Sequence, residues 1–459
     1  MKKYQDYFKD KKITVMGLGL LGRGVGDAAY IAEAGAKEVL VTDLKTEAEL
    51  TESVEKLKGY SNVTFVLGEH REEDFQNRDL VLVSADVHYQ SPYLAHARQS
   101  SVPLKQSAAL FAELSQIPII GVTGTRGKSM VTHMVHHILS YTTGEDIILG
   151  GNIKGVSNLQ LLKQVHKDAL AVMELDSWQL QGFAWAEISP QIAVFTNFME
   201  DHLNYYQKDG VSKEEAMQRY FADKANIFRY QEESGVLVTT PEVFKLAQHY
   251  AKDSDITLGQ EVVLADTSIL PEDLLLATPG EHNRQSAALA YEVAKAVGLT
   301  EEEIESALAT FPGVSGRLQY VGTLEGKMVA VYNDNNATTP QATTVALETL
   351  GQEAKVVLLA GGSDKNIPLE ELVKAIKKYC KEVLLLPGTG TDRLKKELEA
   401  SDISYVAATD LAEAIEKAIA STEDGEILLF SPAFASFGQF KNEYDRNDAF
   451  MRELGQYQA

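Results

Sequence analysis

The sequence predicts an α/β protein built from three domains with parallel sheets. Short apolar runs alternate with amphipathic helical patterns along the chain, and two glycine-rich turns each follow such a run. Because βαβ units join parallel strands through helices, this alternation favours parallel sheets. The length of 459 residues exceeds one ordinary core and fits about three domains of roughly 100 to 200 residues each.

Each predicted domain contains its own set of strands. We place the domain boundaries near 114 and 314, the second at the turn-like segment FPGVSG. The prediction is a Rossmann-like N-terminal domain (1–114), a central P-loop ATPase-type domain (115–314) and a C-terminal Rossmann-like domain (315–459). The expected strands are 13–16, 39–42, 63–67 and 80–84 in the first domain, 119–122, 169–174 and 192–196 in the second, and 328–332, 355–360, 382–386 and 426–430 in the third.

Composition and charge narrow the classes of function. The formal net charge of −23 repels the nucleic-acid backbone, so a nucleic-acid partner is not expected. The single cysteine, Cys380, forms no intrachain disulfide and fits a reducing compartment. The first residues, MKKYQDYFKDKK, lack an apolar signal segment. No run approaches the roughly 18 apolar residues of a membrane span. We therefore expect a cytoplasmic protein without membrane insertion.

The first glycine-rich turn, GLGLLG, follows the strand at 13–16 and places Gly17, Gly19 and Gly22 in the G-x-G-x-x-G spacing. Glycines at a strand-to-helix turn let a phosphate approach the backbone, and the helix N-terminus attracts the anion. Asp43 ends the next strand, as an acidic residue does in dinucleotide-binding domains. The pattern indicates a nucleotide diphosphate but does not choose among NAD, FAD and a diphosphate-linked sugar. A tight turn with a purely structural role is the alternative.

The second turn, TGTRGKS, follows the strand at 119–122 and is expected to hold the phosphate that reacts. Backbone N–H groups can cradle phosphate oxygens, Lys128 can reach the β- and γ-phosphates, and the Ser129 hydroxyl suits Mg²⁺. The spacing departs from strict G-x-x-x-x-G-K-[ST], because Val122 occupies the position of the first glycine. The expected ATP-binding residues of this loop are Gly124, Thr125, Gly127, Lys128 and Ser129.

Two residues near the ends of predicted strands are candidates for metal binding. Glu174 ends the apolar run ALAVMEL, and His202 lies just beyond the run AVFTN. A bound triphosphate needs Mg²⁺, which prefers oxygen ligands, so the histidine suggests a second and less demanding metal position. For each residue alone, a solvated side chain is the alternative.

Nine motifs occur in order along essentially the whole chain. They are TGTRGKS at 123–129, GGNIKG at 150–155, ELDSWQL at 174–180, TNFMEDHL at 196–203, GEHNRQSA at 280–287, GRLQYV at 316–321, YNDNNATTP at 332–340, GGSDK at 361–365 and SPAFASFGQFKNEYDRN at 431–447. Together they resemble the Mur ligases of bacterial cell-wall synthesis. The N-terminal domain, ELDSWQL and SPAFASFGQFKN look most similar to the members that join D-glutamate to UDP-N-acetylmuramoyl-L-alanine.

This resemblance implies an ATP-dependent ligase. GLGLLG and Asp43 would hold the UDP of the carrier substrate UDP-N-acetylmuramoyl-L-alanine, and TGTRGKS would hold ATP. The γ-phosphate would pass to the carrier's terminal carboxylate, and the amine of D-glutamate would attack the resulting acyl phosphate. We also expect two Mg²⁺ sites, which Mn²⁺ could fill, and a monomeric protein.

The resemblance also implies roles for particular residues. Lys128, Glu174, His202 and Lys224 would be catalytic, Ser129, Glu174 and His202 would bind metal, and Lys224 would be carbamylated. The remaining ATP contacts would be Asn283, Arg317 and Asp334. The UDP-sugar contacts would be Gly17, Gly19, Leu20, Leu21, Asp43, Ser84 and Asn152, and the contacts to the incoming amino acid would be Lys365, Ser436 and Phe437.

Four positions depart from the family pattern. Arg126 replaces an asparagine of the ATP loop, and Asn336 stands where a lysine is expected. SADV at 84–87 replaces an SPGV turn, and KQS at 105–107 replaces a segment that is usually acidic. The competing interpretations are a nicotinamide- or flavin-dependent oxidoreductase, a non-catalytic nucleotide-binding paralogue, and a ligase for another amino acid such as L-glutamate.

Overall fold

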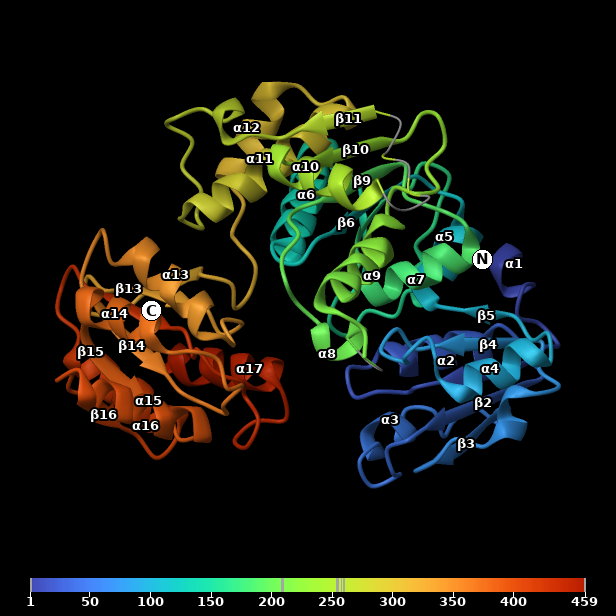
Figure 1. Ribbon diagram of the computed structural model, residues 1–459, viewed down its shortest axis with the longest axis horizontal. Coiled ribbons are helices and arrows are strands. Elements are labelled where there is room, and N and C mark those ends of the chain that lie inside the picture. Colours follow the sequence, from blue (N-terminus) through green and yellow to red (C-terminus); the bar gives the residue numbers. More distant parts are fainter. Residues whose placement is uncertain (1, 208–209, 253–255, 257, 259–260, 458–459) are drawn as a thin grey trace. The chain divides into compact units, whose positions relative to one another are not determined.

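The computed structural model describes residues 2–207, 210–252, 256, 258 and 261–457. Helices alternate with strands along the chain, and the strands form three separate sheets (Figure 1). The predicted α/β class is therefore confirmed. Among these residues, none of the helices combines the length and the apolar character that crossing a bilayer requires.

The first sheet is parallel and has the strand order β3-β2-β1-β4-β5. Strand β1 pairs with both β2 and β4, so the strand order reverses at β1. In open parallel sheets, ligands bind outside the carboxyl ends of the strands at such a reversal. The elements are α1 (Lys2–Gln5), β1 (Lys12–Met16), α2 (Arg23–Glu33), β2 (Glu38–Asp43), α3 (Thr51–Glu55), β3 (Val63–Leu67), β4 (Leu80–Val83), α4 (Pro92–Gln99), β5 (Leu104–Lys105) and α5 (Ser107–Ser115).

The second sheet is also parallel and has the order β11-β10-β9-β6-β8-β7. Strand β6 lies between β9 and β8, and its Val122 is in register with Glu174 of β8. The observed strand β8 begins at Ala171 and is therefore shorter than the strand predicted at 169–174. The elements are β6 (Ile119–Thr123), α6 (Lys128–Thr143), β7 (Ile148–Gly151), β8 (Ala171–Glu174), α7 (Ser177–Ala186), β9 (Ile192–Phe195), α8 (Leu203–Tyr206), α9 (Lys213–Ala225), β10 (Val236–Thr239), α10 (Pro241–Ala251), β11 (Glu261–Leu264), α11 (Glu281–Val297) and α12 (Glu301–Ala309).

The third sheet has the order β12-β13-β17-β14-β15-β16. Strand β12 runs antiparallel to β13, an arrangement that the βαβ pattern did not predict. The remaining pairings in this sheet are parallel. The elements are β12 (Gln319–Thr323), β13 (Ala330–Asn333), α13 (Pro340–Leu350), β14 (Val356–Ala360), α14 (Glu370–Tyr379), β15 (Cys380–Leu385), α15 (Thr389–Ala400), β16 (Val406–Ala407), α16 (Leu411–Ser421), β17 (Ile427–Phe430) and α17 (Glu443–Leu454).

The chain divides into two compact units, Met1–Glu272 with Gln285–Ala307 and Asp273–Arg284 with Leu308–Ala459. The first unit contains the first two sheets, and one continuous core joins residues such as Val15 of β1 to Phe195 of β9. In the second unit, neighbouring residues of β14 alternate between two cores, as a strand with both faces buried requires. The domain boundaries near 114 and 314 stay predictions.

Candidate active site

The helices after the two glycine-rich turns begin in the same way. Gly22 before α2 has φ 81° and Gly127 before α6 has φ 79°, and neither helix start has a side-chain cap. This left-handed backbone is strained for other residues but accessible to glycine. A helix start without a capping side chain leaves N–H groups available to an anion.

The first loop is held by the carboxylate of Asp43 at the end of β2. Its Oδ2 atom accepts hydrogen bonds from the backbone N–H of Leu18 at 2.8 Å and of Gly19 at 3.1 Å, and its Oδ1 atom accepts one from Lys45 N at 2.9 Å. Asp43 is buried. The structure therefore places this predicted ligand contact where it fixes the shape of the glycine loop.

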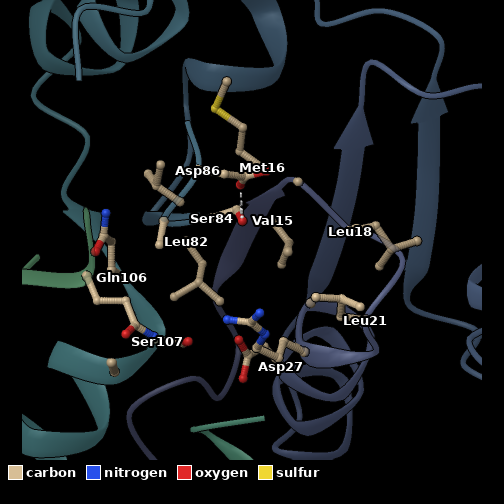
Figure 2. Close-up of a pocket in the computed structure, with 18 of the residues that line it drawn as sticks. Val15, Met16, Leu18, Leu21, Asp27, Leu82, Ser84, Asp86, Gln106 and Ser107 are labelled. Carbon is tan, nitrogen blue, oxygen red and sulfur yellow. Dashed lines mark hydrogen bonds between the residues drawn. The ribbon is translucent and has the colours of Figure 1, made fainter. Parts of the chain in front are cut away.

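A cavity of about 390 Å³ lies beside this loop (Figure 2). Six predicted UDP-sugar contacts line it, whereas Asp43 does not. Sequence reasoning missed other polar residues on its walls. The lining includes the predicted Gly17, Gly19, Leu20, Leu21, Ser84 and Asn152, and the residues that were missed include Arg23, Lys45, Gln106 and Asp176.

Contacts between α2 and the chain after β7 close one side of this cavity. Arg23 Nη1 donates a hydrogen bond to Asn152 Oδ1. Asp27, which is buried, accepts hydrogen bonds from Ser157 Oγ at 2.6 Å and from Leu159 N at 3.2 Å. Burial raises the pKa of Asp27, and these hydrogen bonds oppose the rise. A buried polar bridge therefore fixes the position of Asn152 relative to the first loop.

The second loop is held by neutral groups that follow β9. The carbonyl oxygen of Asn197 accepts from Thr125 N at 2.9 Å, and its side-chain Oδ1 accepts from Arg126 N at 2.8 Å. A Cβ atom at Gly124 would lie 2.0 Å from Thr196 Oγ1, so only glycine allows this close approach. The motif TNFMEDHL therefore contributes the support of the loop, a role that its sequence did not indicate.

Two lysines that are far apart in the sequence meet at this loop. Lys128 Nζ donates to the carbonyl oxygens of Gly124 and Thr125, both at 3.1 Å. Lys224 Nζ, from α9, donates to the same Gly124 oxygen at 2.7 Å. Lys224 is 1% exposed, and burial together with the nearby Lys128 lowers its pKa well below the usual lysine value. Two amines are thus concentrated where phosphate would bind.

The metal candidates include two buried oxygen donors. Glu174 and Ser129 are buried, at the end of β8 and in the first turn of α6 respectively. Thr123 Oγ1 is also buried and has no hydrogen-bond partner among the described residues. In that part of the chain, no three acidic, histidine or cysteine side chains form a ready metal cage. Such oxygen donors fit Mg²⁺ that completes its coordination with phosphates and water.

His202 lies in an aromatic setting. Its ring centroid is 4.9 Å from that of Trp178 and 5.8 Å from that of Tyr220. Burial lowers its pKa, which favours the neutral ring that a metal ligand requires. Its Nε2 atom is 4.0 Å from a carboxylate oxygen of Asp201.

The predicted amino-acid contacts gather in the second unit. Lys365, Ser436 and Phe437 line a cavity of about 310 Å³ together with Arg317 and Asn336. Lys365 Nζ donates to Thr338 Oγ1 at 3.0 Å. An arginine and a lysine in the lining of this cavity offer cationic partners for a small molecule with carboxylates. The structure therefore brings these three predictions together.

Two of the remaining predicted ATP contacts are engaged inside the second unit. Asn283 Nδ2 donates to Pro279 O at 2.8 Å. Asp334 accepts hydrogen bonds from Leu318 N at 3.0 Å and Ser431 Oγ at 2.8 Å. Burial raises the pKa of Asp334 to about 7. Their roles toward ATP, and that of Arg317, stay predictions.

Family models match two parts of the chain. Residues 122–261 match the Mur ligase middle domain, and residues 316–434 match the Mur ligase glutamate ligase domain. The UDP-N-acetylmuramoylalanine--D-glutamate ligase of Roseiflexus sp. is 33% identical, over 96% of this chain and 98% of that protein. This chain belongs to the Mur ligase family. The corresponding ligase of Borreliella afzelii is 30% identical over 97% of this chain and 98% of its own length.

Solved Mur ligases share the fold. UDP-N-acetylmuramate-alanine ligase from Thermotoga maritima has a TM-score of 0.61 at 20% identity, covering 97% of this chain and 99% of that one. The MurF ligase of Thermotoga maritima, in complex with ADP, has a TM-score of 0.55 at 15% identity, covering 98% and 96%. The family membership and the fold predicted from the sequence motifs are therefore confirmed.

Proposed function

We propose that this chain is an ATP-dependent ligase that joins D-glutamate to UDP-N-acetylmuramoyl-L-alanine. The observation that carries the proposal is the convergence of Lys128 and Lys224 on the Gly124 carbonyl at the second loop. Support also comes from the full-length similarity to ligases named for this reaction. The Lys128 cation at a glycine loop suits the transfer of a phosphoryl group between two anions.

The first step forms an acyl phosphate. An oxygen of the carrier's terminal carboxylate attacks the γ-phosphorus of ATP, and the bond to the β-phosphate oxygen breaks to release ADP. Lys128 and the loop N–H groups would bind the phosphate oxygens and hold the reactants in line. Mg²⁺ bound by Ser129 and Glu174 would offset the phosphate charge.

The second step forms the amide. The amine of D-glutamate attacks the acyl carbon, a tetrahedral intermediate forms, and phosphate leaves as the amine loses a proton. Lys365 and Ser436 would bind the carboxylates of the incoming amino acid in the cavity of the second unit. The diphosphate of the carrier would lie at the first loop, beside Arg23 and Asn152.

Lys224 would act as a carbamate. Its depressed pKa favours the unprotonated amine, which is the form that reacts with CO₂, and the product is an anion. That anion would help to hold the ligands around a second metal ion near His202. Mn²⁺ could replace Mg²⁺ at this position. We further propose domain boundaries near 114 and 314, a monomeric protein and a cytoplasmic location.

Phosphate release tests the proposal. The protein is incubated with ATP, Mg²⁺, UDP-N-acetylmuramoyl-L-alanine and a panel of D- and L-amino acids. We expect release that requires both the carrier and D-glutamate. Release with L-glutamate but not D-glutamate would reassign the acceptor, and no release with any amino acid would contradict the ligase function.

A further inference from the structure

Gln106 has a buried amide without hydrogen-bond partners. The residue is 2% exposed. Neither Nε2 nor Oε1 has a hydrogen-bond partner within the part of the chain that the structure describes. A buried amide normally finds partners, because leaving its donor and acceptor unpaired costs free energy. Gln106 therefore needs an explanation that the folded chain itself does not supply.

Gln106 lies at the wall of the first-loop cavity and packs against α7. Gln106 precedes α5 and lines the cavity with Ser107 and Asn158. In Figure 2, Gln106 and Ser107 lie on the opposite side of the pocket from Leu18 and Leu21. A Cβ atom at Gly182 of α7 would lie 2.7 Å from both Cβ and Oε1 of Gln106. The missing side chain at position 182 thus leaves the space that Gln106 occupies.

The position of Gln106 indicates which part of a carrier it would meet. Asp176 and Trp178, at the start of α7, line the same cavity. They follow Glu174, which ends β8 beside β6 and the second loop. A carrier substrate that extends from the first loop to the second loop would pass this side of the cavity. The part that passes it would be the sugar and the amino acid that follow the diphosphate.

We propose that Gln106 pairs with a secondary amide of the carrier on the sugar side of its diphosphate. This inference rests on the proposed function. The Nε2 atom would donate to the amide carbonyl, and Oε1 would accept from the amide N–H, so one ligand group satisfies both unpaired atoms. Two amides of UDP-N-acetylmuramoyl-L-alanine have this chemistry, the acetamido group of the sugar and the amide to L-alanine.

The test compares wild-type protein with Gln106→Met, which keeps the length of the side chain. Both are titrated with UDP, UDP-glucose, UDP-N-acetylglucosamine and UDP-N-acetylmuramoyl-L-alanine. We expect unchanged affinity for UDP and UDP-glucose, which lack these amides, and about tenfold weaker binding of the carrier. If UDP-N-acetylglucosamine loses affinity by the same factor, the acetamido group is the partner of Gln106. If its affinity is unchanged, the partner is the amide to L-alanine.

Stability separates this role from a structural one. Gln231 offers a matched control, because its Nε2 atom donates to Pro190 O, Gln191 O and Val236 O at 3.0 to 3.1 Å. Gln231→Met should lower the Tm and leave carrier affinity unchanged. Gln106→Met should keep or raise the Tm, because an unpaired amide is replaced by an apolar group.

Several results would overturn the role of Gln106. They are unchanged carrier affinity in Gln106→Met, an equal loss for every ligand including UDP, and a variant that fails to fold. Wild-type protein that binds none of the UDP compounds would instead contradict the carrier site of the proposed function.

Discussion

The two glycine loops share a geometry but differ in the charges that hold them. Both connect a parallel strand to a helix through a left-handed glycine, at Gly22 and Gly127. The first loop is fixed by the carboxylate of Asp43, which already accepts two of its backbone N–H groups. The second is fixed by neutral groups of Thr196 and Asn197 and receives the amines of Lys128 and Lys224.

This difference indicates why one chain carries two such turns. The carboxylate of Asp43, at the end of β2, fixes the shape of the first loop but lowers the positive potential there. Such a loop suits a diphosphate that is bound but does not react. The Lys128 cation at the second loop opposes the charge of a triphosphate as a carboxylate approaches it. Under the proposed function, the two loops share a glycine pattern but not a task, and the surrounding charges separate binding from chemistry.

The largest expected effect is at the second loop. Lys128→Ala should lower the rate of ligation by about 10² to 10³, because a preorganised charge contact to the transferred phosphate is lost. Phosphate release under saturating substrates measures the change, and circular dichroism checks the fold. Lys374→Ala is the control, since Lys374 is exposed and its ion pair with Glu371 lies on the surface. Near-normal turnover of folded Lys128→Ala would remove the basis for assigning ATP to this loop.

A somewhat smaller loss is expected at Lys224. Lys224→Ala should lower the rate about a hundredfold, and acetate or formate should restore part of it by occupying the position of the lost carbamate. Lys128→Ala, which removes a cation, should gain nothing from these anions. Full activity of Lys224→Ala without additives would show that the carbamate assignment is wrong.

The pH dependence of Lys224 follows from its lowered pKa. Carbamate formation needs the unprotonated amine, which is present above the lowered pKa and lost as the pH falls through it. Wild-type activity should therefore decrease in CO₂-depleted, mildly acidic buffer and recover when bicarbonate is added. Activity that ignores bicarbonate throughout this range would contradict carbamylation.

At the first loop we expect a loss of binding. Asp43→Ala removes the acceptor of two loop N–H groups and should weaken binding of UDP-N-acetylmuramoyl-L-alanine about tenfold. Asp79→Ala is the matched control, because Asp79 Oδ2 accepts from Lys12 N at 2.8 Å at the opposite end of β1. Equal effects of the two substitutions on carrier binding would show that Asp43 has no special role at the loop.

The smallest effect is expected at Arg126. Its backbone N–H is bonded to Asn197, and its side chain is exposed. Arg126→Asn should change the KM for ATP by less than about threefold, with the difference shrinking as salt is added, because an exposed charge is screened. A large change that persists at high salt would place Arg126 on the phosphates.

The sequence predicted features that are local in the chain. Both glycine turns and the strands before them were found, because their patterns lie within a few residues. The support of the second loop by Asn197 was not predicted, since it depends on which strand pairs with β6. The antiparallel β12 was also missed, because its short alternating run carries no sign of its partner.

The other features that the sequence did not predict depend on packing between distant parts of the chain. Lys224 follows Asp223 on a polar helix, and the local pattern reads as a surface lysine; the resemblance to the family alone singled it out. Its burial comes from the packing of α9 against the loop a hundred residues earlier. Gln106 lies in KQS at 105–107, which departs from the family pattern, but its unpaired amide is visible only once α5 and α7 are packed together.

The separate roles of the two loops, carrier binding at the first and ATP binding at the second, are tested most directly by measuring how two variants bind both ligands. Asp43→Ala and Lys128→Ala are each titrated calorimetrically with UDP-N-acetylmuramoyl-L-alanine and with a non-hydrolysable ATP analogue. We predict that Asp43→Ala loses affinity for the carrier alone and Lys128→Ala for the ATP analogue alone. Loss of both ligands in one variant, or the reverse pattern, would contradict the separate roles of the two loops.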